Sequence, residues 1–280
     1  MRAIAVCMRL ALRTAVALGA CLAGTASAND PNTLTDEEKR AGFELLFNGR
    51  DLRGWEPEMG PWELKDGPWK VEEGAIYFQG DCPGFPALAC CKLVPPDFDL
   101  RFEWKEAPSS KSGLQGHFII GTHGAMTQNG WAGWLFCSYF AGERGINVRA
   151  AEVSVPIKFA GVSMSETPRK DAKRPPGKWN TARMVCKGPL FQHWLNGEKI
   201  VEIDLRHGDW LKLENEPGNP LLDQWFKVRT RGFGLAIENT DAPAWFRSIK
   251  VRAIPKDEEI ATGKSQRQES KSEGGNTKKR

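Results

Sequence analysis

Few side chains in this sequence could act as a general base, the group that removes a proton in many enzyme reactions. Glu103 lies in an alternating charged and apolar run, His117 follows a Ser-Gly pair, and Glu238 lies in a mostly apolar stretch. A carboxylate in apolar surroundings must find a partner or take a raised pKa, which suits a base near neutral pH. These three are the candidate catalytic residues, although Glu103 between Arg101 and Lys105 could equally form an ion pair.

Tryptophan is abundant, with eleven Trp against two Tyr. Trp131 and Trp134 lie in a Gly-rich segment, and Trp179 precedes Asn180. Flat indole rings on loops suit the apolar face of a sugar ring, and a neighbouring amide can bind its hydroxyl groups. We therefore expect these four residues to bind a carbohydrate. The alternative is that the indole rings pack against the edge of a sheet.

A divalent cation is one of two interpretations of a further set of residues. His117 and His123 are six residues apart and could share a metal ion, but the sequence offers no clear third ligand. Glu238, Asn239 and Asp241 carry oxygen atoms that suit Ca²⁺ or a sugar hydroxyl group. The same three residues could instead cap the end of a strand.

Short strands must position these groups. In residues 99–105, the apolar residues Leu100, Phe102 and Trp104 alternate with charged ones. Within residues 183–205, two runs flank Asn196-Gly197. This pair is a strong hairpin signal because both residues tolerate a positive φ. Repeated short strands without an alternating helix predict an all-β protein with few short helices, folded as an antiparallel β-sandwich or jelly roll.

A third strand is predicted over residues 244–254. Strict alternation there predicts one face made of Trp245, Arg247, Ile249 and Val251, and an opposite face made of Phe246, Ser248, Lys250 and Arg252.

The first 28 residues have the three parts of a secretory signal peptide. Basic residues precede the apolar stretch 15–23, and small residues follow at 26–28. We expect cleavage before Asn29 and export to the periplasm or the extracellular space. A lipid anchor on Cys21 is the alternative, because the preceding Leu-Gly-Ala resembles a lipobox. No later segment reaches the roughly 20 apolar residues that a transmembrane helix needs, so none is expected.

The charge of the chain argues against a nucleic-acid ligand. The formal net charge is +4, from 39 basic and 35 acidic residues. Three of the basic residues lie in the first 28 residues, which contain no acid. The nearly neutral remainder has no general electrostatic attraction to nucleic acid or to an anionic membrane. A carbohydrate of small size is the expected ligand, and no protein partner can be named.

The remaining chain divides into three parts. Residues 29–42 form a polar extension with a short capped helix beginning near Thr35, and residues 43–254 form the sandwich. Residues 255–280 are rich in charge, Ser and Gly and are expected to be disordered. In an oxidising compartment, Cys82 would pair with one of its neighbours at 90 and 91, and the other cysteines would be buried thiols.

The segment Leu46–Trp55, which reads LFNGRDLRGW, resembles the opening of the 3-keto-disaccharide hydrolase domain family. Further landmarks of that family follow in order: Trp69–Gly74, Asp97–Lys105, Ser112-Gly113, Pro176–Asn180, Leu195–Gly197 and Trp245–Ile249. The resemblance covers roughly residues 43–254 and implies a concanavalin-like jelly roll. It also implies action on glycosides whose sugar carries a ketone at carbon 3.

A ketone at carbon 3 acidifies the hydrogen on carbon 2, and loss of that proton can expel the aglycone from carbon 1. Such an enzyme needs one base, a group that stabilises the enolate oxygen, and an apolar platform for the ring.

The chain departs from the family pattern in two places. Residues 133–139 contain no acid where a Glu-x-Gln-like strand is usual, and residues 235–240 lack the usual Gln and His-Gly. A non-catalytic carbohydrate-binding module on the same fold is therefore the alternative function. A scaffold of the cell envelope is a third, which rests only on the predicted export and the basic tail.

Overall fold

The computed structural model describes residues 30–57, 65–80, 82, 86–110, 171–204, 232–235 and 242–261, and the strand backbones of 58, 115–121, 126–127, 130–131, 134–139, 146–149, 163–166, 231 and 236–239. Within these residues the chain forms two antiparallel sheets, one two-stranded hairpin and one short helix.

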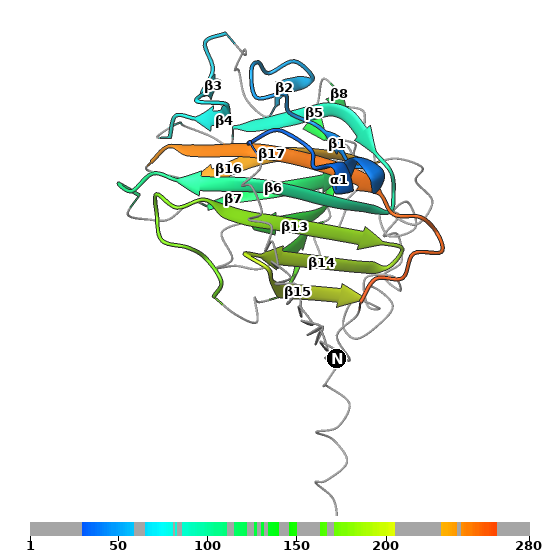
Figure 1. Ribbon diagram of the computed structural model, residues 1–280. Helices are drawn as coiled ribbons and strands as arrows, with labels where there is room; N and C mark the ends of the chain where they lie inside the picture. The colour runs from blue at the N-terminus through cyan, green and yellow to red at the C-terminus, as the bar shows by residue number, and fades with distance from the viewer. Residues whose placement is uncertain are drawn as a thin grey trace, which may run out of the picture.

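The first sheet, sheet A, runs through neighbouring strands in the order seen down Figure 1. From one edge to the other, it contains β3 (Trp69–Glu72), β4 (Ala75–Phe78), β17 (Ala244–Ala253), β6 (Phe98–Glu106), β13 (Asn180–Lys187), β14 (Leu190–Leu195) and β15 (Glu198–Asp204). The short β1 (Glu44–Leu45) pairs with β17.

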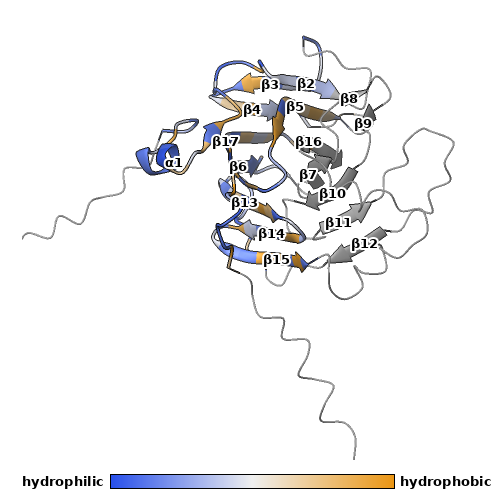
Figure 2. Cartoon of the chain, turned by 90° about the vertical axis from the view of Figure 1, so that its right-hand side faces the viewer, coloured by the Kyte–Doolittle hydropathy of each residue, from blue (hydrophilic) through white to orange (hydrophobic). Residues whose placement is uncertain are grey.

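The second sheet, sheet B, faces sheet A across the core, as Figure 2 shows. It contains, in order, β2 (Trp55–Glu58), β5 (Ala87–Val94), β16 (Arg231–Asn239), β7 (Gln115–Gly121), β10 (Trp134–Tyr139), β11 (Ile146–Arg149) and β12 (Ser163–Glu166). The hairpin pairs β8 (Met126–Thr127) with β9 (Gly130–Trp131). The predicted all-β sandwich is confirmed.

The core lies between the two sheets and is built by alternation along the strands. On β6, the side chains of Leu100, Phe102 and Trp104 are buried, as predicted, and β16 contributes Phe233 and Leu235 to the same cluster. Burial of each such side chain stabilises the fold by about 1.5–3 kcal/mol. Residues of β6 between these positions therefore face away from sheet B.

The predicted hairpin is also confirmed. β14 ends at Leu195 and β15 begins at Glu198, so Asn196 and Gly197 form a two-residue turn. Both residues have a positive φ, 50° and 86°, which is the geometry of the turn that matches the twist of paired strands.

The strict alternation predicted for β17 is wrong because the strand contains a β-bulge. The register shifts between Arg247 and Lys250, and Ser248 takes the positive φ of 53°. One extra residue reverses the parity of the strand. Phe246 is therefore buried on the first half of β17, whereas Ile249 is buried on the second half.

The N-terminal extension contains the predicted helix, α1 (Asp36–Arg40), which packs beside β17. Thr35 caps it in a reciprocal capping box with Glu38. The second carboxylate oxygen of Glu38 pairs with Lys250 Nζ at 2.5 Å, and both side chains are largely buried. This pair ties the helix to the outer face of sheet A.

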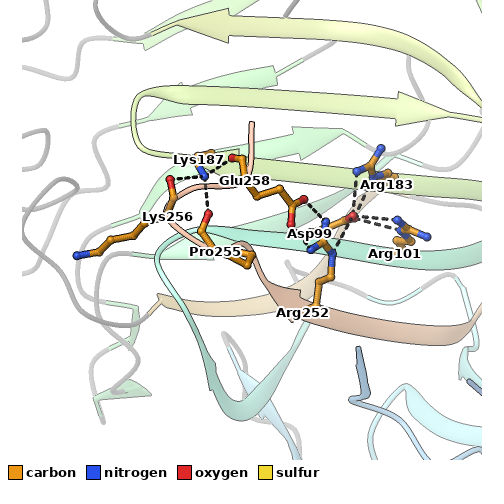
Figure 3. Close-up of polar contacts among 8 residues, drawn as sticks. All are labelled: Asp99, Arg101, Arg183, Lys187, Arg252, Pro255, Lys256 and Glu258. Carbon is orange, nitrogen blue, oxygen red and sulfur yellow. Dashed lines mark hydrogen bonds and ion pairs between the residues drawn. The ribbon is translucent and has the colours of Figure 1, made fainter. Parts of the chain in front are cut away.

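The tail predicted to be disordered from residue 255 is ordered over residues 255–261. Lys187 Nζ donates to three carbonyl oxygens of this segment, one of them that of Glu258 (Figure 3). Gln192 Nε2 donates to the carbonyl oxygen of residue 261 at 2.7 Å. Residue-specific hydrogen bonds thus offset the ordering entropy that composition alone suggested would dominate. The rest of the predicted tail lies outside the described residues.

The loop disulfide expected from cysteine spacing is wrong, since Cys90 and Cys91, the two predicted partners of Cys82, both carry free thiols. Cys90 and Cys91 are adjacent on β5, so their side chains point to opposite faces. Cys90 enters the core, where burial raises its pKa to about 12 and keeps the thiol protonated. Within the described residues, no helix is long and apolar enough to span a membrane.

Acid should destabilise this fold through His193, which lies on β14 and is fully buried. Burial lowers the pKa of His193 from 6.5 to about 3. Below about pH 6.5 the unfolded chain binds a proton that the folded chain refuses, so stability falls by about 1.4 kcal/mol per pH unit until the folded pKa is reached. Urea unfolding at pH 6.5 and 5.0 should therefore show a loss about 2 kcal/mol larger in wild type than in His193→Gln.

Comparing the loss of stability between pH 6.5 and 5.0 in the two proteins removes two other effects. Carboxylates titrate alike in both proteins, and any constant cost of a buried Gln cancels between the two pH values. Equal losses in wild type and variant would contradict the buried, neutral state of His193.

Candidate functional site

Glu103 lies on β6 between two neighbouring strands of sheet A. It pairs in register with Arg247 on β17 and with Thr181 on β13. Arg247 Nε donates to Glu103 Oε2 at 2.7 Å, and Ser248 Oγ donates to the same oxygen at 3.3 Å. About a quarter of each charged side chain is exposed, 27% for Glu103 and 25% for Arg247. Glu103 is thus the ion pair that the sequence offered as the alternative to a base.

The β-bulge at Ser248 joins this ion pair to the N-terminal extension. Ser248 N donates to Asn32 Oδ1 at 2.8 Å, and Asn32 Nδ2 donates to the carbonyl oxygen of Gly74 at 2.7 Å. Gly49 has a φ of 77°, and a Cβ atom there would lie 2.6 Å from the Asn32 side-chain nitrogen, so a larger residue would be strained and would displace this asparagine. One asparagine therefore joins the N-terminal extension to the bulge and to the turn at Gly74.

Gly49 belongs to the decapeptide that carries the family resemblance, and the structure explains its other residue types. Asn48 Oδ1 accepts from the backbone amides of Arg50 and Asp51, which is an Asx turn. Hydrogen bonds from Asn48 and from the Arg53 backbone lower the pKa of Asp51. The residue types of the decapeptide thus stabilise a turn of the fold.

The decapeptide closes on Trp55, which is buried and donates its indole N–H to the carbonyl oxygen of Leu46 at 2.8 Å. The buried donor thereby has a partner, as the energetics of a core tryptophan require.

Trp179 and Asn180, expected together as sugar ligands, have different surroundings. Asn180 is buried, and its Oδ1 accepts from the Arg174 backbone and from Asn196 Nδ2, both at 2.8 Å. Its amide is used inside the protein, so it does not offer a contact to a sugar hydroxyl. Trp179 is partly exposed on the outer face of sheet A, with the Arg247 guanidinium 3.8 Å from its ring centre.

His117 and Glu238 lie on the neighbouring central strands of sheet B. His117 on β7 pairs in register with Ala236 on β16 and with Tyr139 on β10. Glu238 is the extra residue at an irregularity of β16, two positions beyond the partner of His117. Neighbouring strands lie about 4.8 Å apart, so the backbones at 117 and 238 are close.

The remaining two sugar candidates also fall on strands. Trp134 opens β10 opposite Gly121, and Trp131 lies on β9 in the separate hairpin. The Gly-rich segment predicted as a loop therefore contains strand residues at both positions. The side chains of His117, Trp131, Trp134 and Glu238 lie outside the described part of the structure, as does His123.

The structure does not bring all three candidate bases together. Phe102 and Trp104 face the core, so Glu103 projects from the outer face of sheet A. Packed sheets lie about 10 Å apart, and the core fills that space. Glu103 therefore cannot join His117 and Glu238 in one recess. What sheet B does juxtapose is the pair of strands carrying His117 and Glu238.

A buried charged cluster on sheet A escaped sequence reasoning. The Asp99 side chain is fully buried and accepts hydrogen bonds from Arg101 and Arg183, with Arg252 Nε 3.6 Å away (Figure 3). Burial acts to raise the pKa of Asp99, but the hydrogen bonds from Arg183 and Arg101 outweigh it and the pKa is lowered. Arg183 is 84 positions away along the chain, so no local pattern could reveal it.

Comparison with known proteins agrees with this architecture. A protein of Parabacteroides distasonis, described only provisionally as a glycosyl hydrolase, shares 20% sequence identity with this chain at a TM-score of 0.54. The structural match covers 81% of this chain and the whole of the Parabacteroides protein. At this identity the likeness shows a shared fold. A second such protein from the same organism has 17% identity and a TM-score of 0.47, covering 76% of this chain and 99% of its own.

Carbohydrate-binding module CBM66 of Bacillus subtilis has 14% identity and a TM-score of 0.42, covering 71% of this chain and 96% of its own. No curated protein matches the sequence at a significant level. The model of the 3-keto-alpha-glucoside-1,2-lyase-like domain, however, matches residues 42–252, which span both sheets of the sandwich. This confirms the resemblance seen in the decapeptide and its later landmarks, and the chain belongs to the family of 3-keto-alpha-glucoside-1,2-lyase-like domains.

Proposed function

We propose that this protein is an exported carbohydrate-active enzyme that cleaves 3-keto-glycosides by removing the proton on carbon 2. The observation that carries the proposal is the match of the family model to residues 42–252, which include every strand of the two sheets except part of β17. The strands that carry His117 and Glu238 are neighbours in sheet B, which supports a site there.

The proposed reaction needs no redox partner. A base, His117 or Glu238, takes the proton from carbon 2, and the electron pair of that C–H bond forms the enolate with the carbon 3 ketone. The enolate then collapses, the bond between carbons 1 and 2 becomes double, and the bond from carbon 1 to the aglycone oxygen breaks. That oxygen takes a proton and the aglycone leaves. Addition of water across the new double bond completes net hydrolysis.

Within this proposal, Trp131 and Trp134 supply the apolar platform for the sugar ring. A divalent cation such as Ca²⁺ near His117 would stabilise the enolate oxygen. Among the residues whose side chains the structure describes, no group of three or more His, Cys, Asp or Glu is arranged to hold such an ion.

The proposal is tested by incubating the purified protein with a chromogenic 3-keto-glucoside and with the matching glucoside. Release of the aglycone from the 3-keto compound alone is expected, with a new double bond or the hydrated sugar as the second product. Assays with EDTA and with added Ca²⁺, Mn²⁺ or Zn²⁺ determine whether a cation takes part. Absence of turnover under all these conditions would overturn the proposal.

A non-catalytic carbohydrate-binding function is the second candidate. It is favoured by the absence of an acid in residues 133–139 and of a His-Gly in residues 235–240. Binding of a glycan without turnover, lost in Trp134→Ala, is its expected signature.

Export is tested on the mature chain. Mass spectrometry of the protein recovered from its native host or from a bacterial periplasm should give an N-terminus at Asn29. The reason is that residues 26–28 match the small side chains that signal peptidase accepts. A diacylglycerol-modified Cys21 would contradict cleavage at this position and support the lipid-anchored alternative.

A further inference from the structure

A single line of five side chains crosses the outer face of sheet A, on the opposite sheet from His117 and Glu238. Strand register pairs Lys70 with Tyr77, Tyr77 with Trp245, and Trp245 with Lys105. Trp179 directly precedes Asn180, which pairs with the residue before Lys105, so Trp179 continues the same line. We call these five residues the aromatic–cation row. They come from β3, β4, β17, β6 and the residue before β13, which succeed one another in Figure 1.

The members of the row touch one another in sequence. Lys70 Nζ lies 4.6 Å from the Tyr77 ring centre, and the Tyr77 and Trp245 rings are 5.3 Å apart. Lys105 Nζ lies between two indoles, 4.5 Å from Trp245 and 5.0 Å from Trp179. These are cation–π distances. Four steps between neighbouring strands give the row a length of about 19 Å.

The aromatic rings of the row are not part of the core. Tyr77, Trp245 and Trp179 are each partly exposed, whereas Trp69 and Trp104 on the inner face of the same sheet are buried. The exposed parts of these three rings form an apolar area that a ligand could cover.

The row has an excess of positive charge. Lys70 is 3.3 Å from Glu72, and Arg247 beside Trp179 is paired with Glu103. Lys105, in contrast, forms no ion pair with a carboxylate among the described residues. The loop that ends at Trp179 adds two exposed cations next to the row, Arg174 and Lys178.

We propose that the aromatic–cation row is a binding site for an extended acidic polysaccharide, one whose sugar rings carry carboxylate groups. Pyranose rings would stack on the Trp245 and Trp179 indoles, and a sugar carboxylate would pair with Lys105 between them. The linear shape of the row favours an extended polymer over a compact ligand. The Lys105 ammonium, which has no carboxylate partner among the described side chains, favours an anionic sugar over a neutral one. The site would hold a polymeric substrate or anchor the protein to a matrix.

The test uses the full mature chain and hexagalacturonate as the probe, with binding measured by calorimetry and by tryptophan fluorescence. Wild type should bind hexagalacturonate at least about tenfold more tightly than cellohexaose, and the affinity should fall as NaCl is raised to 0.5 M. Lys105→Gln should weaken binding by about tenfold, because it keeps part of the side-chain stem and removes the charge. Trp245→Ala should weaken it at least as much.

Trp194→Ala is the matched control. Trp194 lies on β14 of the same sheet, is partly exposed, and also contacts two cations, Arg183 and Lys199, but it is outside the row. Its loss should leave the affinity unchanged. Thermal melts of each variant confirm folding, and if Trp245→Ala does not fold, Lys105→Gln carries the test.

Three results would overturn the inference: no binding of hexagalacturonate by wild type, unchanged affinity in Lys105→Gln, or tighter binding of single-stranded oligothymidylate than of hexagalacturonate. Turnover of the 3-keto-glucoside should be unaffected in Lys105→Gln, so failure of this inference is distinguishable from failure of the proposed function.

Discussion

Replacing the general base of the proposed reaction, which is either His117 or Glu238, with Gln is expected to lower the rate of aglycone release from a 3-keto-glucoside by about two to four orders of magnitude, the contribution of a positioned general base. The two residues lie on adjacent strands of sheet B, and one of them must take the proton from carbon 2 in the proposed reaction. The variant that removes the base should lose kcat, and the other should lose less. Single-turnover kinetics separates the chemical step from substrate binding.

Glu103→Gln is the control for this experiment, because sequence alone made Glu103 an equal candidate. Its carboxylate is paired with Arg247 on the outer face of the other sheet. Turnover by Glu103→Gln should stay close to that of wild type, with at most a modest fall in thermal stability, since partly exposed ion pairs contribute little. Loss of turnover in Glu103→Gln, with His117→Gln and Glu238→Gln still active, would place the chemistry on sheet A and contradict the assignment.

The fold was predictable from local patterns because each pattern encodes which side faces the core. Leu100, Phe102 and Trp104 alternate with charged residues, and that alternation fixed the inner face of β6. The turn at Asn196-Gly197 needs only two residues that tolerate positive φ. Where alternation failed, on β17, the cause was a serine in a left-handed conformation, which no sequence pattern signals because bulges favour glycine at that position.

The candidate site was less predictable because its contacts join distant parts of the chain. Glu103 and Arg247 are 144 residues apart, and only strand pairing shows that they meet. Asn180 looked like a ligand for a sugar hydroxyl because it follows a tryptophan. Its side-chain oxygen, however, accepts hydrogen bonds from Arg174 and Asn196 in neighbouring loops. The residue types alone indicated which side chains could act as a base or bind a sugar. Which of the two sheets each of them lies on depended on the topology.

The aromatic–cation row illustrates the same limit. Its members lie between residues 70 and 245, and each was visible in the sequence only as a lysine or an aromatic residue. Their alignment follows from the order β3, β4, β17, β6 and β13, in which the chain leaves the sheet several times and returns. Register therefore turns five unremarkable side chains into a continuous surface.

The same topology creates the Asp99 cluster, and its disruption should have the largest effect on stability. Replacing Asp99 with Asn is expected to lower the free energy of unfolding by about 3 kcal/mol, the low end for breaking a buried charge cluster. Arg101 and Arg183 each donate two hydrogen bonds to the buried carboxylate. Without it, these cations and Arg252 would repel one another, with Glu258 as the remaining anion in contact with Arg252. The two arginines are about a third exposed, so water screens part of the repulsion.

Urea unfolding at pH 7 measures this loss, and Asp97→Asn is its matched control. Asp97 directly precedes β6, the strand that carries Asp99. Its carboxylate accepts one backbone hydrogen bond, from Gly188. Its replacement should cost only about 1 kcal/mol.

The pH dependence of the Asp99 effect has a definite sign. Because the pKa of Asp99 is lowered in the fold, its stabilisation is fully present above the unfolded value near 3.8 and is lost only as the pH falls through the folded pKa. The difference between wild type and Asp99→Asn should therefore persist from pH 7 to about pH 4.5 and shrink in stronger acid.

The double variant Asp99→Asn/Arg183→Met tests whether repulsion among the arginines causes the loss. Removing one guanidinium from a cluster that has lost its central anion relieves repulsion and exposes less unpaired charge. The double variant should therefore be more stable than Asp99→Asn alone, even though Arg183→Met by itself is destabilising. If the two losses simply add, the three arginines do not depend on a common anion. The cluster would then be three independent contacts, and the loss of about 3 kcal/mol would need another cause.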